Sequence, residues 1–168
     1  MAYADDLLEV AQHLAKLDST NPRQASLRRS VSTAYYALFH LLITEATSNW
    51  IRPELHSELP LGRLFGHGKM KSASKEQRSE LNSLFKKNLP LETLTVFKHL
   101  HAVAHTFILA QEKREEADYD TGKEWNQTEV LKQIDSVAAA FESWRAIREE
   151  PVAQAYLVSL LGIRPRSE

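Results

Sequence analysis

Cysteine is absent from the 168 residues of this chain. Its absence excludes disulfide bonds, thiol nucleophiles and cysteine-ligated zinc sites. Long apolar runs are missing too, because the longest one, near residues 37–43, is interrupted by His40 and is far too short to span a bilayer. The first ten residues, MAYADDLLEV, are acidic and amphipathic, unlike a secretory signal. We therefore expect a cytoplasmic protein that does not engage a membrane.

Signals for β-strands are almost absent, whereas helical periodicity runs through most of the chain. Glycine and proline make residues 51–73 a predicted long loop with about one turn of helix. A capping-box pattern over Ser74–Gln77 is expected to open the helix that follows this loop. The predicted helices cover residues 4–17, 22–50, 74–87, 90–117, 126–150 and 151–161. The prediction is a single all-α domain over residues 1–168, an antiparallel up-down bundle of four main helices plus one or two short ones.

The helix expected to end near Trp50 is unusually polar along the edge of its apolar face. Side chains spaced three, four, seven and eleven residues from Arg29 fall in one stripe at 3.6 residues per turn. The stripe holds a cation, two hydroxyls, a phenol and an imidazole, from Arg29, Ser32, Thr33, Tyr36 and His40. Such a stripe either forms a polar cluster between helices or lines a site, and both interpretations remain open.

The chain is nearly neutral, with a net charge of −1, but its middle is basic. The cations that lie close together there are Arg63, Lys69, Lys71, Lys75, Arg78, Lys86 and Lys87. A basic segment can meet phosphates or an acidic partner. Because the excess of positive charge is small, we favour a solvated charged face over a nucleic-acid footprint.

Three stretches resemble signatures of the HEPN superfamily (higher eukaryotes and prokaryotes nucleotide-binding domains), in its small prokaryotic branch. Residues 27–40, LRRSVSTAYYALFH, are similar to a helix in which an Arg precedes Tyr-Tyr-Ala-x-Phe-His. Residues 66–69, GHGK, resemble a His-Gly turn after the second helix, and residues 114–120, REEADYD, resemble the closing Arg-x-x-Ala-Asp-Tyr-Asp of the fourth. Together the matches span residues 28–120.

The resemblance implies an antiparallel helical bundle that often forms a homodimer in toxin–antitoxin or defence systems, sometimes beside a small nucleotidyltransferase partner. Many such proteins are metal-independent endoribonucleases, in which an Arg is followed after four to six residues by a His at a dimer cleft. That pair can polarise a ribose 2′-hydroxyl and stabilise charge on the phosphate. This chain lacks the spacing, because the nearest pairs, Arg52 with His56 and Arg63 with His67, have only three intervening residues.

The candidate site residues follow from the stripe and the resemblance together. The catalytic candidates are His67, His40 and Arg114. The candidates for binding nucleotide or RNA, or for a polar cluster, are Arg29, Tyr36, Asp118, Tyr119 and Lys69. The structural alternative is favoured for two of these groups. His40 in an apolar run is commonly a satisfied core residue, and Arg114 and Asp118, buried against Arg29 and Tyr36, would form a network that links two helices.

His101 and His105 have the i, i+4 spacing of a helical metal site. The His-Glu-x-x-His pattern is missing because Ala102 follows the first histidine, and no third ligand is evident. We therefore interpret this pair as a polar strip and predict neither a metal nor a cofactor. No Gly-x-Ser-x-Gly nucleophile elbow occurs either.

Two functions from different classes fit these observations. The first is a HEPN-like protein that interacts with RNA or nucleotides, with endoribonuclease activity as its catalytic form. The second is a non-catalytic helical dimer that binds or scaffolds a partner protein such as a nucleotidyltransferase, through an exposed apolar face. The terminal segment PVAQAYLVSLLG is the candidate for that face. The missing Arg-to-His spacing favours the second function.

Overall fold

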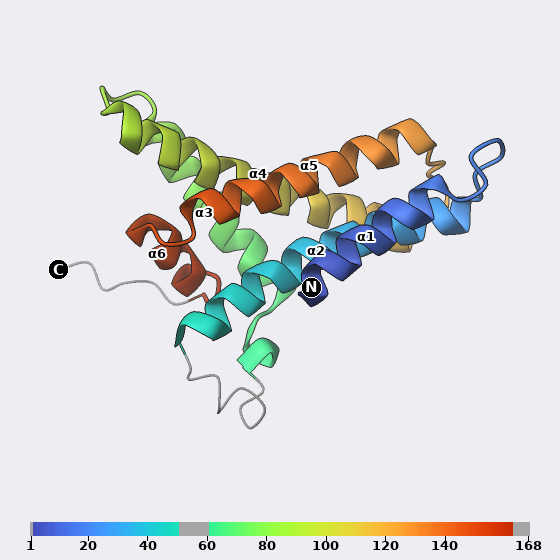
Figure 1. The fold of residues 1–168 in the computed structure, drawn as a ribbon, viewed down its shortest axis with the longest axis horizontal. Helices are drawn as coiled ribbons and strands as arrows, with labels where there is room; N and C mark the ends of the chain where they lie inside the picture. The colour runs from blue at the N-terminus through green and yellow to red at the C-terminus, as the bar shows by residue number, and fades with distance from the viewer. Residues whose placement is uncertain (1, 51–60, 163–168) are drawn as a thin grey trace. The chain divides into compact units, whose positions relative to one another are not determined.

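Helices form most of the chain in the computed structural model, which describes residues 2–50 and 61–162 (Figure 1). In chain order they are α1 (Tyr3–Lys16), α2 (Gln24–Trp50), the 3-10 turn η2 (Leu61–Leu64), α3 (His67–Leu84), α4 (Leu91–Tyr119), α5 (Gln127–Ile147) and α6 (Pro151–Ser159). No strand occurs within the described ranges, so the all-α prediction is confirmed. None of the helices described is long and apolar enough to cross a membrane.

Boundary signals in the sequence account for several helix ends. At the start of α5, the backbone N–H of Glu129 donates to Asn126 Oδ1 over 2.8 Å, the bond expected of an N-cap. Pro151 occupies the first turn of α6, where its missing N–H costs nothing. After α6, Gly162 adopts a φ of +77°, which glycine reaches without strain.

The start of α3 differs from the sequence prediction. The helix begins at His67 rather than at Ser74, so residues 67–73 are helical and the predicted loop is wrong there, while residues 51–60 lie outside the described part. Ser74 is fully buried inside the helix, and its hydroxyl donates to the backbone carbonyl of Met70 over 2.7 Å. Met70 and Ala73 are buried on one face of the helix, and this burial explains why α3 begins before the capping pattern at Ser74.

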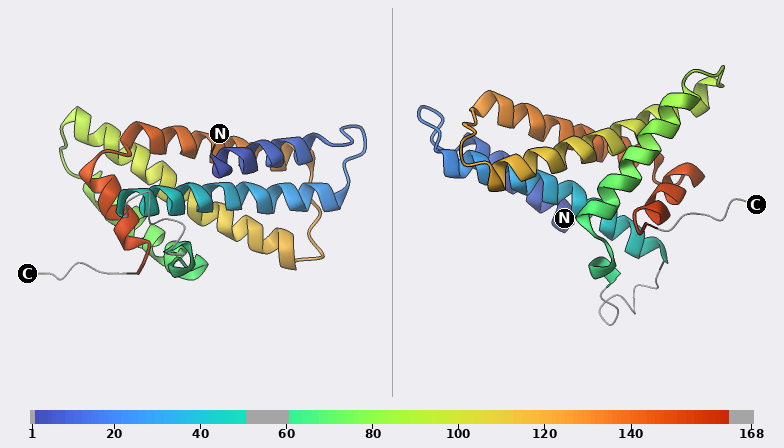
Figure 2. Two further views of the ribbon diagram at one scale, coloured as in Figure 1. Left: turned by 60° about the horizontal axis from the view of Figure 1, so that its bottom comes forward. Right: turned by 180° about the vertical axis from the view of Figure 1, so that it is seen from behind.

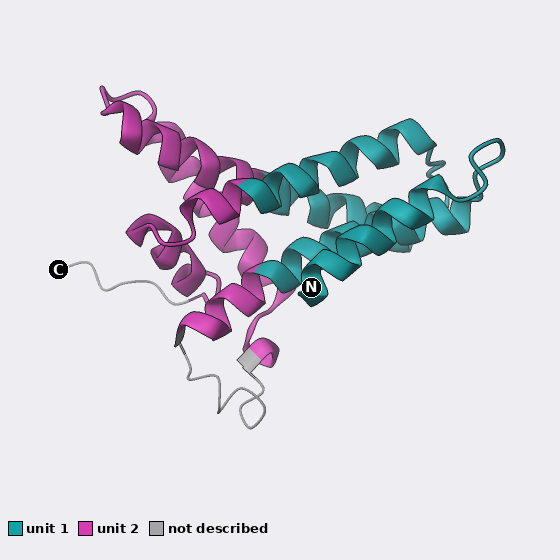
Figure 3. Ribbon diagram, viewed as in Figure 1, with its two compact units in different colours: residues 1–41, 106–142 teal, residues 42–105, 143–168 magenta. Residues whose placement is uncertain are grey.

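The chain divides into two compact units, each assembled from separate stretches (Figure 3). Unit 1 comprises residues 1–41 and 106–142, and unit 2 comprises residues 42–105 and 143–168. The prediction of one domain over residues 1–168 is not tested by this division and stays a prediction.

Unit 1 contains α1, the first part of α2, the last part of α4 and most of α5. Within it α1 runs antiparallel to α2, and α4 runs antiparallel to α5 (Figures 1 and 2). The Ser30 hydroxyl on α2 donates to the Ala11 carbonyl on α1 over 2.7 Å, and the Gln127 amide on α5 donates to the Ala15 carbonyl over 2.9 Å. Large fully buried side chains of this unit are Leu27, Tyr35, Leu38, Phe107, Ile108 and Phe141.

Unit 2 contains α3 and α6, which contact each other, together with the remaining parts of α2, α4 and α5. Its fully buried large side chains include Leu42, Met70, Leu81, Leu100, Trp144 and Tyr156. The terminal segment predicted to expose an apolar face is mostly buried, because Tyr156, Leu157 and Leu160 are completely covered within this unit. Only Val158 of its large side chains is exposed, at 39%. The exposed-face prediction is therefore wrong for most of α6.

Candidate functional site

The polar stripe of α2 lines a groove against α1 in unit 1. Arg29, Thr33, Tyr36 and His40 form one side of a pocket of about 390 Å³, which we call the α1–α2 groove. Its α1 side is formed by Tyr3, Leu7, Val10 and Leu14. The groove therefore has one polar wall and one mainly apolar wall, which is the usual make-up of a small-molecule site. The helical spacing predicted this shared face for Arg29, Thr33, Tyr36 and His40. Ser32, the fifth residue of the predicted stripe, does not line the groove and donates to Asp118 instead.

Three polar side chains in the groove have no hydrogen-bonding partner among the described residues. Within the described ranges, Arg29, Thr33 and His40 make no side-chain hydrogen bond or ion pair. Arg29 is exposed, whereas Thr33 is only 8% exposed. A guanidinium, a hydroxyl and an imidazole thus lie along one groove with their hydrogen-bonding capacity available.

His40 is held by aromatic rings. Its ring lies 5.0 Å from that of Tyr3 at 72° and 5.4 Å from that of Phe39 at 87°, both edge-on. Tyr36, one turn earlier on α2, lies 6.4 Å away. Burial lowers the pKa of His40, so the imidazole is neutral near pH 7 and can accept a proton or a hydrogen bond.

Arg114 supports the aromatic side chains of α2 instead of lining the groove. The guanidinium of this buried residue lies 5.2 Å from the Tyr35 ring and 5.9 Å from the Tyr36 ring, and its Nη1 is 3.8 Å from Asp118 Oδ2. The Ser32 hydroxyl donates to the same carboxylate oxygen over 3.4 Å. This arrangement links α2 to α4 and favours the structural interpretation of Arg114 and Asp118 over a catalytic one.

A second depression, of about 420 Å³, lies at the end of α4 and shares Arg29 with the α1–α2 groove. Its lining residues are Ala25, Arg28, Arg29, Ala117, Asp118 and Tyr119. Tyr119 is 74% exposed at its rim. The predicted binding residues Arg29, Asp118 and Tyr119 therefore do come together in unit 1.

Sequence reasoning missed the role of Arg28. Its guanidinium donates to three backbone carbonyls at the end of α4: to Ala117 in the last turn of the helix over 2.9 Å, to Asp120 just after it over 2.8 Å, and to Lys123. The last carbonyls of a helix have no partner within the helix, so the carbonyls around the turn Asp120–Lys123 require hydrogen-bond donors from elsewhere. Which arginine supplies them is fixed by the packing of α2 on α4 and not by any local pattern.

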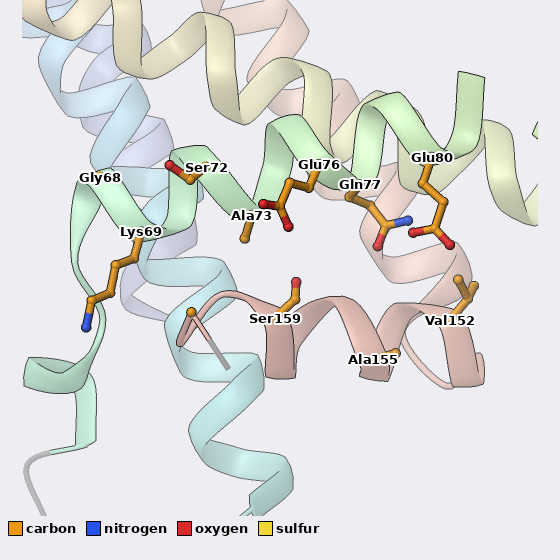
Figure 4. Close-up of a pocket in the computed structure, with 11 residues that line it drawn as sticks. Gly68, Lys69, Ser72, Ala73, Glu76, Gln77, Glu80, Val152, Ala155 and Ser159 are labelled. Atoms are coloured by element: carbon orange, nitrogen blue, oxygen red, sulfur yellow. The ribbon is translucent and has the colours of Figure 1, made fainter. Parts of the chain in front are cut away.

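His67 and Lys69 belong to unit 2. His67 is the first residue of α3, not part of a glycine-flanked loop, and it is partly exposed. Lys69 lines a groove of about 600 Å³ between α3 and α6, on whose α3 side Glu76 and Glu80 project toward α6 (Figure 4). The structure groups neither residue with His40 and Arg114, which belong to unit 1.

The pair His101 and His105 forms a polar strip between α4 and α3. Their rings stack at 5.8 Å and 16°, and each is hydrogen-bonded to a side chain of α3. Across the described residues, no group of three or more His, Cys, Asp or Glu side chains is arranged to hold a metal ion.

Comparison with protein-family models, curated proteins and solved structures finds no match to this chain. The HEPN resemblance therefore rests on the three sequence stretches alone and stays a prediction.

Proposed function

We propose that the chain is a HEPN-like protein that binds RNA or a nucleotide in the α1–α2 groove. The observation that supports this best is the row of unengaged polar groups on α2, from Arg29, Thr33 and His40, facing an apolar wall. A guanidinium suits a phosphate, because its donors match the phosphate oxygens in pairs. The aromatic rings of Tyr3 and Tyr36, with the apolar wall, suit the faces of a base.

Binding is better supported than cleavage. Arg114 is buried against two tyrosine rings, so it is not available to stabilise a developing phosphate charge. Arg29 and His40 share the groove but stand eleven residues apart, unlike the ribonuclease spacing. His40 is the one imidazole lining this groove, and in its neutral form it has the protonation state of a general base. An RNA-cleavage assay on the wild type and a His40→Gln variant therefore separates a binding protein from a ribonuclease.

The setting of this function is taken from the resemblance. It is a cytoplasmic homodimer in a toxin–antitoxin or defence system, paired in some cases with a nucleotidyltransferase. The alternative, a non-catalytic scaffold for such a partner protein, is favoured by α1, which exposes 61% of Tyr3 and 48% of Val10 at the groove. A stable dimer that binds no RNA or nucleotide would support the scaffold.

The test of the proposed function removes the unengaged cation. Arg29→Ala should weaken the binding of a fluorescent single-stranded RNA about tenfold or more, because a charge-assisted contact is worth at least about 1.5 kcal/mol. Fluorescence anisotropy at several salt concentrations measures the dissociation constant. Arg23→Ala removes the same charge from a residue that pairs with Asp18 on the surface and does not line the groove, so it should leave affinity almost unchanged. Equal affinity of the wild type and Arg29→Ala, or no binding by the wild type, contradicts the proposal.

A further inference from the structure

Two successive hydrogen bonds join α3 to α4 in unit 2, apart from the residues of the proposed function. Arg78 Nη1 lies 3.0 Å from His105 Nδ1, and His101 Nε2 lies 3.1 Å from Asn82 Oδ1. The partners are four residues apart on each helix and pair in opposite order along the chain, so the bonds form neighbouring rungs on one face. Both histidines are partly exposed and can exchange protons with solvent.

The bond to Arg78 fixes the protonation state of His105. A guanidinium has donors and no acceptor, so the Nδ1 atom that it contacts must offer a lone pair. His105 is therefore the neutral imidazole with its proton on Nε2. The ring of His101 stacks on it at 5.8 Å, which places a permanent cation and two imidazoles in contact.

We propose that Arg78, His101 and His105 form an acid-sensitive latch that holds α3 against α4 at neutral pH and loosens it when the histidines take up protons. A proton on His105 Nδ1 removes the lone pair that accepts from Arg78 and places a second positive charge 3.0 Å from the guanidinium. A proton on His101 adds a positive charge that is repelled by Arg78, and by His105 once that ring is also protonated.

No acidic partner is paired with the cluster within the described residues. The charged side chain hydrogen-bonded to the cluster is Arg78 of α3, and the other direct partners of the two imidazoles are the neutral Asn82 amide and the Phe85 ring. His99, two residues before His101 on α4, is hydrogen-bonded over 3.1 Å to the uncharged Ser143 side chain of α5. In the described part of the chain, no carboxylate forms an ion pair with Arg78, His101 or His105. Burial first, and then the charges of His105 and Arg78, lower the pKa of His101.

Loosening of α3 would also affect the groove that this helix forms with α6. The same helix forms one wall of the groove between α3 and α6 (Figure 4). Ser74 on this helix is hydrogen-bonded to Tyr156 of α6. The latch therefore makes this 600 Å³ groove sensitive to pH.

Hydrogen exchange of the whole chain at pH 7.4 and pH 5.5, corrected for intrinsic exchange rates, tests the latch. In the wild type, protection of the amides of residues 75–84 should fall about tenfold at the lower pH, because α3 opens more often once the imidazoles repel Arg78. In His105→Gln an uncharged amide oxygen can still accept from Arg78, so the fall should largely disappear. His13→Gln removes an exposed histidine of α1 in unit 1 and should retain the wild-type fall.

Equal protection of α3 at the two pH values in the wild type would overturn the latch, as would an undiminished fall in His105→Gln. If the His105→Gln variant does not fold, the same exchange measurement is made on Arg78→Gln. The amide of this variant can donate to His105 but carries no charge. The loss of α3 protection between pH 7.4 and pH 5.5 should then be smaller than in the wild type. A loss as large as that of the wild type overturns the proposal. Nitrogen NMR shifts that place the His105 proton on Nδ1 at pH 7.4 would also overturn it.

Discussion

At the scale of single residues, the Tyr156 hydroxyl shows how a buried polar group is satisfied. Tyr156 is completely buried, and its hydroxyl lies 2.7 Å from Ser74 Oγ. Because Ser74 donates its own proton to the Met70 carbonyl, Tyr156 must be the donor in this pair. Burial raises the pKa of Tyr156, so the phenol keeps the proton that the bond requires.

Ser74→Ala should lower the free energy of unfolding by about 1–3 kcal/mol, because it leaves a buried hydroxyl without its acceptor. Urea denaturation followed by circular dichroism measures the change. The double variant Ser74→Ala with Tyr156→Phe removes both partners and should lose less stability than Ser74→Ala alone. A single variant as stable as the wild type would show that the pair does not contribute.

The candidate site was partly predictable at this scale. The helical period of 3.6 residues is enough to place Arg29, Tyr36 and His40 on one face of α2, and they do line one groove. The groove's apolar wall and the position of Arg114 depend on contacts between helices distant in sequence. No sequence pattern within α2 or α4 indicates that the Arg114 guanidinium will contact the rings of Tyr35 and Tyr36.

At the scale of secondary-structure elements, the end of α4 depends on a donor from another helix. Arg28 of α2 satisfies carbonyls of Ala117, Asp120 and Lys123, which lie 89 to 95 residues away in sequence. Arg28→Ala should lower the free energy of unfolding by about 2 kcal/mol and increase hydrogen exchange at the end of α4, because these carbonyls lose a charged donor. Urea denaturation and exchange mass spectrometry measure the two effects.

The neighbouring residue provides the matched control. Arg29 carries the same charge on the same turn of α2, but it is exposed and makes no hydrogen bond or ion pair within the described part of the chain. Arg29→Ala should therefore leave stability within about 0.5 kcal/mol of the wild type. If the two variants were equally destabilised, Arg28 would have no special role in holding the end of α4.

The boundaries of α3 show where local signals stop being decisive. Ser74-Lys75-Glu76-Gln77 has the residue types of a capping box, yet the helix continues through it from His67. A capping interaction contributes about 1 kcal/mol, whereas full burial of a side chain such as Met70 contributes about 1.5–3 kcal/mol. Burial against the rest of unit 2 therefore outweighs the local alternative, and the sequence around Ser74 does not reveal that burial.

For the whole molecule, the periodicity of apolar residues predicted the helical content and the long helices. It did not predict that the chain divides into two compact units. The unit boundaries fall within α2, α4 and α5, after Leu41, His105 and Glu142. None of these points carries a glycine or a proline, and each helix continues across its boundary. Sequence punctuation marks the ends of helices, so it cannot mark a division that lies within them.

Each unit contains a histidine that makes stability depend on pH. Burial lowers the pKa of His40 in unit 1 and of His101 in unit 2 below the ordinary value of 6.5. The folded protein therefore binds fewer protons at these residues than the unfolded chain does. Their contribution to stability is complete above about pH 6.5 and is lost as the pH falls through the lowered values. Lys123, whose pKa is raised by its hydrogen bond to Glu129, acts only at alkaline pH.

The urea concentration at the unfolding midpoint should consequently fall between pH 7.5 and pH 5. The variant that combines His40→Gln and His101→Gln should show a flatter dependence, because neither residue can then take up a proton on unfolding. His13→Gln, which changes an exposed histidine of α1, should follow the wild-type curve. A double variant with the wild-type slope would contradict the assignment. The pH dependence would then have to arise from other titratable groups of the chain.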